Sequence, residues 1–206
     1  MNLPLTHIWQ PALVESNRLM IVLHGRGDSA HGFEWLQEEL GIGSINYLLL
    51  NAPGRYYDGF SWYDLEPNQL PGIVQSRKLL TEVLAETQRA GYPPDRTFLL
   101  GFSQGCLMTL EFGARYEHTL AGYIGISGYC FDPAALLREN PAVNNGNWLI
   151  THGTEDDLLP VEITRAQIQQ LSAGGFKIDY REYMKPHTVD FERELPSIVR
   201  WLQGLI

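Results

Sequence analysis

The sequence predicts an α/β fold in which a doubly wound, mostly parallel sheet is flanked by helices on both faces. Short apolar runs recur along the 206 residues, and stretches with helical periodicity separate them. Most of these runs are continuously apolar, as expected of strands that are buried on both faces of a parallel sheet. Regular alternation of such strands with helices indicates right-handed crossovers within one layered sheet.

Six segments are expected to form strands, and four groups of residues indicate helices. The strands are Leu19–Leu23, Tyr47–Leu50, Thr97–Leu100, Leu120–Ile126, Trp148–Ile150 and Lys177–Tyr183. The helices are indicated by residues that share one helical face: Ile73, Leu80 and Leu84; Leu107, Leu110 and Ala114; Val161, Thr164, Ile168 and Leu171; and Leu195, Ile198, Val199 and Leu202. No repeat, low-complexity tract or linker interrupts this order, so we expect a single domain over residues 1–206.

Composition and charge argue against several classes of partner. The chain has 15 Lys and Arg against 24 Asp and Glu, and its net charge of −9 repels phosphate backbones, so no nucleic acid is expected. The N-terminus lacks a secretory signal pattern, and no apolar run approaches the ~20 residues of a membrane span. Cys106 and Cys130 are too few for a disulfide framework. We therefore expect a cytoplasmic protein with reduced, buried thiols.

Two loops break the alternation, and both are expected at the carboxyl ends of strands, where ligands bind in open α/β sheets. The segment HGRGDSAHG (24–32) follows the first strand, and the aromatic segment 52–72 is long enough to suggest function. The Arg-Gly-Asp tripeptide also matches a cell-adhesion motif, but its place directly after a buried strand disfavours that interpretation. His24 and His31 lack the partner cluster of a zinc site, so no metal is expected, and His24 is interpreted as a structural hydrogen-bonding residue.

The pentapeptide Gly101-Phe102-Ser103-Gln104-Gly105 fits the G-x-S-x-G pattern and lies between a predicted strand and a predicted helix. In a nucleophile elbow the serine occupies a strained backbone conformation that exposes its hydroxyl, and the flanking glycines keep the turn free of clashes. The turn also aims the backbone N–H of Gln104 and the positive end of the helix at one point. Ser103 is thus the predicted nucleophile, and Cys106 is expected to pack below the elbow. The alternative is a glycine-lined turn with an incidental serine.

A serine hydroxyl needs a general base and an orienting acid, which in this type of fold follow the serine in the order acid, then histidine. Of the six histidines, His187 alone lies beyond acidic residues on a strand-end loop. The acidic candidates are Glu155, Asp156 and Asp157 in HGTEDDLLP, and each alone would be an ordinary turn residue. The spacing therefore predicts His187 as the base and leaves three candidates for the acid.

An oxyanion hole needs a second donor besides the Gln104 N–H. Gly25 and Gly27 in HGRGD would let the backbone approach the site closely and point the Arg26 N–H into it. A triad with two such donors predicts hydrolysis of an ester or thioester through an acyl-enzyme, without a cofactor. A non-catalytic binding protein on the same scaffold would not need all these positions, and the absence of an added screening domain disfavours a peptidase.

Together these residues resemble the phospholipase/carboxylesterase family of small α/β-hydrolases, which includes acyl-protein thioesterases and bacterial carboxylesterases. The matching segments are LHGRGDSAHGFEWL, NAPGRYYDGFSWYDL, LLGFSQGCLMTLEFGARY, ISGY, HGTEDDLLP and Met184–His187, in the family's order across nearly the whole chain. The resemblance implies an α/β-hydrolase fold with Ser103 as nucleophile, Asp156 as acid and His187 as base. It also implies oxyanion donors at Arg26 and Gln104.

The aromatic segment 52–72 bears on the substrate. Its aromatic side chains could line a pocket for an acyl or aryl group, or could simply cover the sheet edge; they are Tyr56, Tyr57, Phe60, Trp62 and Tyr63. Arg26 stands where the family usually has leucine, and together with Arg55 it favours a substrate with an anionic portion. A small-molecule carboxylic ester, a lysophospholipid and a protein thioester all stay open as substrates. The same aromatic segment could form the surface of a homodimer.

Overall fold

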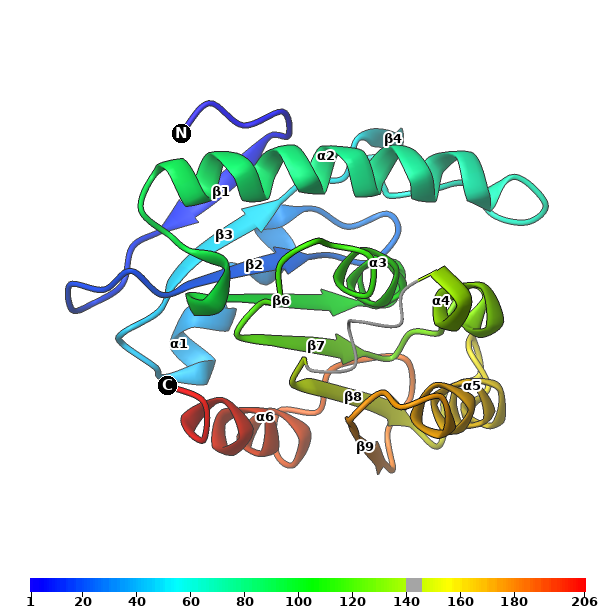
Figure 1. Cartoon of the computed structure of the whole chain (residues 1–206). Helices are drawn as coiled ribbons and strands as arrows, with labels where there is room; N and C mark the ends of the chain where they lie inside the picture. Colours follow the sequence, from blue (N-terminus) through cyan, green and yellow to red (C-terminus); the bar gives the residue numbers. More distant parts are fainter. Residues whose placement is uncertain (140–145) are drawn as a thin grey trace.

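A seven-stranded sheet runs through the centre of the structure, a computed structural model that describes residues 1–139 and 146–206 (Figure 1). The strands are β1 (His7–Gln10), β2 (Leu19–Leu23), β3 (Asn46–Leu50), β6 (Thr97–Phe102), β7 (Gly122–Ile126), β8 (Trp148–Gly153) and β9 (Ile178–Tyr183). Their order in the sheet is β1-β3-β2-β6-β7-β8-β9. Every neighbouring pair is parallel except β1 with β3, which confirms the predicted mostly parallel sheet.

Helices cover both faces of this sheet, as predicted. They are α1 (Leu36–Leu40), α2 (Gln69–Arg89), α3 (Gln104–Gly113), α4 (Pro133–Glu139), α5 (Val161–Ala173) and α6 (Glu194–Gln203). Alternate side chains of β2 enter two separate cores. Leu19, Ile21 and Leu23 pack with α2, α3, α4 and α5, whereas Met20 and Val22 pack with α1 and α6. The two-residue period of the strand thus fills both interior layers. Among the described residues, no helix has both the length and the apolar character needed to cross a membrane.

All six predicted strands and all four predicted helices form, with small shifts at their ends. The aromatic segment is the main difference. It holds a two-stranded hairpin of β4 (Gly54–Tyr56) and β5 (Gly59–Ser61), and its last residues already belong to α2, which begins at Gln69. Pro71 is tolerated there because the first-turn N–H groups of a helix have no intrahelical acceptor. The expectation of one irregular loop over 52–72 was therefore wrong.

The parallel arrangement determines where the active-site segments meet. Strands β2, β6, β7, β8 and β9 all point the same way, so the segments that follow them emerge at one edge of the sheet. Those segments carry HGRGD, the serine turn, the residues after Ile126, HGTEDDLLP and the Met184–His187 stretch. Residues as far apart in the chain as His24 and His187 are thereby brought to a common edge.

Candidate active site

Ser103 occupies a strained turn between β6 and α3. Its backbone has φ 55° and ψ −113°, a conformation that side-chain-bearing residues rarely adopt. The turn has no room for side chains at the flanking positions. A Cβ at Gly101 would lie 2.0 Å from the Gly105 carbonyl oxygen, and a Cβ at Gly105 would lie 2.0 Å from the Leu23 carbonyl oxygen. Gly101 is thus required by the close packing of the turn on itself, and Gly105 by the close packing of the elbow against β2.

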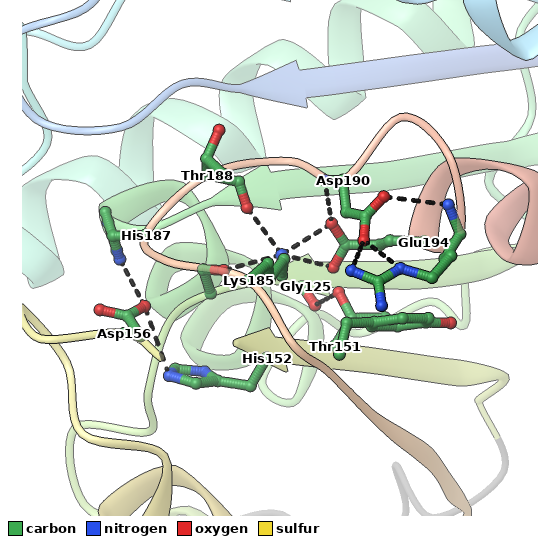
Figure 2. Close-up of polar contacts among 12 residues, drawn as sticks. Gly125, Thr151, His152, Asp156, Lys185, His187, Thr188, Asp190 and Glu194 are labelled. Carbon is green, nitrogen blue, oxygen red and sulfur yellow. Dashed lines mark hydrogen bonds and ion pairs between the residues drawn. The ribbon is translucent and has the colours of Figure 1, made fainter. Parts of the chain in front are cut away.

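His187 lies between Ser103 and Asp156. Its Nε2 is 2.9 Å from Ser103 Oγ, and its Nδ1 is 2.7 Å from Asp156 Oδ2. A carboxylate only accepts hydrogen bonds, so Nδ1 donates to it, and in the neutral ring Nε2 is left as the acceptor that faces the serine hydroxyl. Figure 2 shows the contact between His187 and Asp156. Of the three acidic candidates, the structure brings Asp156 to the histidine.

Asp156 is held by its own turn, whereas its acidic neighbours face solvent. Its Oδ1 accepts hydrogen bonds from the backbone N–H groups of Leu158 (3.1 Å) and Leu159 (2.8 Å), and its side chain is buried. These bonds leave Oδ2 directed at His187. Glu155 and Asp157 are exposed. The two N–H bonds fix the orientation of the Asp156 carboxylate, as the role of an orienting acid requires.

His152, at the end of β8, lies on the other side of Asp156. Its Nε2 is 2.8 Å from the Leu159 carbonyl oxygen and 3.6 Å from Asp156 Oδ2, and the residue is fully buried. Desolvation is the main effect on this ring and lowers its pKa. A neutral ring that donates to Leu159 closes the turn that presents Asp156. Figure 2 shows the His152 ring next to the Asp156 carboxylate.

Two backbone N–H groups flank the serine without an acceptor of their own. Within residues 1–139 and 146–206, neither the Arg26 N–H nor the Gln104 N–H donates to any group. Gln104 is the first residue of α3, where intrahelical acceptors are lacking. A Cβ at Gly25 would lie 3.3 Å from Ser103 Cβ, so the residue before Arg26 packs directly on the serine. The sequence-predicted oxyanion donors are thus unoccupied donors next to Ser103.

A family described as Phospholipase/Carboxylesterase matches residues 7–206 of the chain. The chain belongs to the phospholipase/carboxylesterase family. The resemblance that the sequence motifs indicated is thereby confirmed.

The relatives and solved structures that are similar to this chain cover between 74% and 98% of it. Acyl-protein thioesterase 1 of Yarrowia lipolytica is 29% identical over 217 residues, which span 94% of this chain and 94% of the relative. Acyl-protein thioesterase 1 of Schizosaccharomyces pombe is 31% identical over 169 residues, 74% of each. The crystal structure of esterase PE8 superposes with a TM-score of 0.87 at 25% identity, covering 98% of this chain and 99% of that one. A carboxylesterase from Mesorhizobium loti shares the fold with a TM-score of 0.84 at 18% identity, covering 98% and 96%.

The aromatic hairpin braces the proposed oxyanion loop of this family member. The Gly27 N–H donates to the Phe60 carbonyl oxygen (2.8 Å), and the Phe60 N–H donates to the Asp28 carbonyl oxygen (2.9 Å). The Gln104 side chain ties the same hairpin to the elbow, because its Oε1 accepts from Ser61 Oγ (3.1 Å) and from the Trp62 N–H (3.0 Å). Sequence reasoning assigned Gln104 only a backbone role and missed the hydrogen bonds of its side chain to the hairpin.

Trp62 and Tyr63 are buried in the core, 1% and 3% exposed. Both also contribute, with Arg55, to the lining of a cavity of about 230 Å³, so their interpretation as substrate contacts stays a prediction. The Trp62 Nε1–H donates to the His24 carbonyl oxygen (2.9 Å), and its own carbonyl accepts from Ser76 Oγ (2.6 Å). Tyr63 offers its carbonyl to Gln104 Nε2 (2.8 Å). These hydrogen bonds give both residues a structural role next to the catalytic loop.

The remaining predicted contacts stay near solvent. The Arg26 guanidinium carbon lies 4.0 Å above the Tyr56 ring, and the Arg55 guanidinium carbon lies 4.5 Å above the half-buried Phe60 ring. Neither arginine has a carboxylate partner among the described residues. Both positive charges are therefore available to an anionic group on the hairpin side of the site.

A cavity of about 540 Å³ adjoins the turn that holds Asp156. Its lining is mainly apolar and aromatic, with residues such as Leu65, Gln69, Tyr129, Phe131, Leu159 and Ile163. Gln69 Nε2 donates to the Tyr129 hydroxyl (2.7 Å) across this lining. Sequence reasoning missed the cavity because its walls come from three separate segments.

The cysteines and His24 are structural. Cys106 is fully buried below the elbow, as predicted, and burial raises the pKa of its thiol to about 12. Cys130 is also a buried free thiol whose pKa is raised by desolvation.

The His24 ring donates from Nδ1 to the Gly25 carbonyl oxygen (2.5 Å) and accepts at Nε2 from the Ala52 N–H (3.1 Å), which confirms its predicted hydrogen-bonding role. In the described part of the chain, no three His, Cys, Asp or Glu side chains are grouped to hold a metal ion.

Proposed function

We propose that this chain hydrolyses carboxylic esters or thioesters through an acyl-enzyme, with Ser103 as nucleophile, His187 as general base and Asp156 as the acid that orients it. The observation that carries the proposal is the continuous contact from Ser103 Oγ through the His187 ring to Asp156, at 2.9 and 2.7 Å. Free N–H groups of Arg26 and Gln104 beside the serine supply the two donors that such a reaction needs.

In the proposed reaction, Ser103 Oγ attacks the substrate carbonyl carbon while His187 Nε2 takes the hydroxyl proton. The carbonyl oxygen becomes an oxyanion, and the N–H groups of Arg26 and Gln104 bind it. His187 then gives its proton to the departing alcohol or thiol as the bond to the acyl carbon breaks. Water repeats the sequence on the acyl-enzyme and releases the carboxylic acid. Asp156 holds the tautomer and stabilises the imidazolium formed in each half.

The cavity of about 540 Å³ is the proposed site for the acyl portion of a small-molecule substrate, because its walls are mainly apolar and it adjoins the Asp156 turn. Relatives named acyl-protein thioesterase and esterase make thioesters and oxygen esters the two substrate classes to compare. A series of both classes with acyl chains of 2 to ~16 carbons measures the preference. A flat dependence of kcat/KM on chain length would reject the cavity as the acyl site.

Labelling by a fluorophosphonate probe tests the chemistry. The probe is expected to label the wild-type chain at Ser103, to leave Ser103→Ala unlabelled, and to label His187→Ala at least 100-fold more slowly. A folded wild-type chain that resists the probe and leaves short esters intact would favour the non-catalytic binding protein instead. Circular dichroism spectra of the variants confirm that each remains folded.

A cytoplasmic location and a homodimer are the further parts of the proposal. Two free, buried thiols are consistent with a reducing compartment, and cell fractionation tests the location.

Tyr57 at the tip of the aromatic hairpin is 85% exposed and offers an aromatic contact for a second copy. Light scattering of the wild type and of Tyr57→Ser measures the dimer, and a monomer in both would reject it.

A further inference from the structure

A buried ammonium group lies behind the catalytic residues, on the segment that carries His187. Lys185 is 3% exposed, two residues before the histidine in the chain. Its Nζ lies 2.6 Å from the carboxylate of Glu194, a fully buried residue at the start of α6. The proposed mechanism assigns no task to either residue, and a buried charged pair has to offset a considerable desolvation penalty.

The three N–H bonds of this ammonium join three separate segments of the site. Besides Glu194, Lys185 Nζ donates to the Thr188 carbonyl oxygen (2.7 Å), directly after His187, and to Ser127 Oγ (3.1 Å). Ser127 has φ 50° and follows Ile126, whose carbonyl accepts the Ser103 N–H (2.9 Å). The ammonium therefore connects the strand end that anchors Ser103 to the residue that follows His187.

Glu194 and the Lys185 backbone extend the same connection. Glu194 Oε2 also accepts from the Asp190 N–H (3.0 Å), so the carboxylate fixes the far end of the histidine segment (Figure 2). The Lys185 carbonyl oxygen accepts from the Glu155 N–H (3.2 Å), directly before Asp156. Segments that hold all three members of the proposed triad thus meet at one lysine.

We propose that Lys185 and Glu194 are positioning residues, which hold the 184–190 segment so that the His187 ring stays between Ser103 and Asp156. Neither touches the reacting atoms. This inference rests on the proposed catalytic role of His187. An apolar pair of similar size would fill the space but could not direct the Thr188 carbonyl, the Asp190 N–H and the Ser127 hydroxyl toward one point.

The double variant Lys185→Met/Glu194→Leu tests this role, because replacing both partners by apolar residues avoids an unpaired buried charge. The matched control is Arg115→Met/Glu111→Leu, which removes a pair of the same 2.6 Å separation between α3 and the turn that follows it, outside the histidine segment. With a short p-nitrophenyl ester, the Lys185/Glu194 variant is expected to lose about 10- to 100-fold in kcat with KM within twofold, since small displacements of a catalytic group are enough for such losses. The control is expected to stay within twofold in both.

A folded Lys185→Met/Glu194→Leu variant with wild-type kcat would overturn the inference. Ser127→Ala is the milder second variant: it removes one acceptor of Lys185, and we expect kcat to fall about threefold or more with KM unchanged. If the double variant does not fold, an unchanged kcat in Ser127→Ala overturns the inference instead. Failure of the proposed function looks different, because His187→Ala would then turn over as fast as the wild type.

Discussion

Asp156 Oδ2 lies 2.7 Å from His187 Nδ1, although 31 residues separate the two in the chain, whereas the adjacent Asp157 side chain faces solvent. This difference between neighbours gives the first prediction. Asp156→Asn is expected to lower kcat by about 10⁴-fold, because an amide can stabilise the wrong tautomer of the ring. Asp157→Asn, the matched control, is expected to stay within twofold. Steady-state hydrolysis of a p-nitrophenyl ester measures both, and the reverse order of effects would reject Asp156 as the acid.

The elbow packs so closely on β2 that a single methyl group is expected to disturb it. In Gly105→Ala the new Cβ would lie 2.0 Å from the Leu23 carbonyl oxygen, so α3 must move away from the strand. We expect a loss of about 1–3 kcal/mol in the free energy of unfolding and a fall in kcat. Urea denaturation measures the first effect. Gly204→Ala, whose nearest atom would be 3.4 Å away, is the control and is expected to leave both values nearly unchanged.

The Cys106 thiol gives a prediction for alkaline pH. Its pKa is raised from 9.0 to about 12 because it is fully buried, so between these values the folded state holds a proton that the unfolded state has lost. The stability that this proton contributes is present below pH 9 and is lost as the pH rises toward 12, at up to ~1.4 kcal/mol per pH unit. Urea denaturation at pH 8 to 11 is expected to show a shallower decline in Cys106→Ala than in the wild type.

Cys106→Ala is also expected to retain activity, because the thiol is shielded below the elbow and contacts no reacting group. In the native wild type, iodoacetamide at pH 8 is expected to leave Cys106 unmodified, and in urea it is expected to modify it. Rapid modification of the native protein at this position would contradict the burial.

The unpaired guanidinium of Arg26 is expected to select substrates. Arg26→Leu retains the backbone N–H, so hydrolysis of a neutral ester is expected to change little. For an ester of equal length with a carboxylate in its acyl portion, we expect kcat/KM to fall about tenfold, the size of one partly exposed charge contact. Arg200→Leu, an exposed arginine on α6, is the control. An identical ratio of the two substrates in all three proteins would reject the role of Arg26.

The parts of the fold that could be predicted from the sequence are those with a regular pattern of apolar residues. Apolar runs, most of them continuous, indicated all six parallel strands, and apolar residues on one helical face indicated the four longer helices. Strand β1 escaped notice because its four residues, HIWQ, lie at the sheet edge and are only partly buried. Helices α1 and α4 have five and seven residues, too few to establish a helical face.

The site was predictable where chemistry imposes an order along the chain. The elbow pattern and the later position of His187 led to residues that the structure brings within hydrogen-bonding distance. Side-chain burial has no such signature. The aromatic run could not reveal that Trp62 and Tyr63 point into the core, and nothing in the letters distinguishes Lys185 and Glu194 from ordinary surface charges.

The hairpin of β4 and β5 lies outside the main sheet, yet its backbone holds the loop that carries Arg26. A two-stranded ribbon is marginally stable by itself and opens at lower free-energy cost than a seven-stranded sheet. Heat should therefore disorder the oxyanion donors before it melts the scaffold. The temperature of half-inactivation would then fall below the calorimetric Tm, so that this enzyme has separate thresholds for catalysis and for folding.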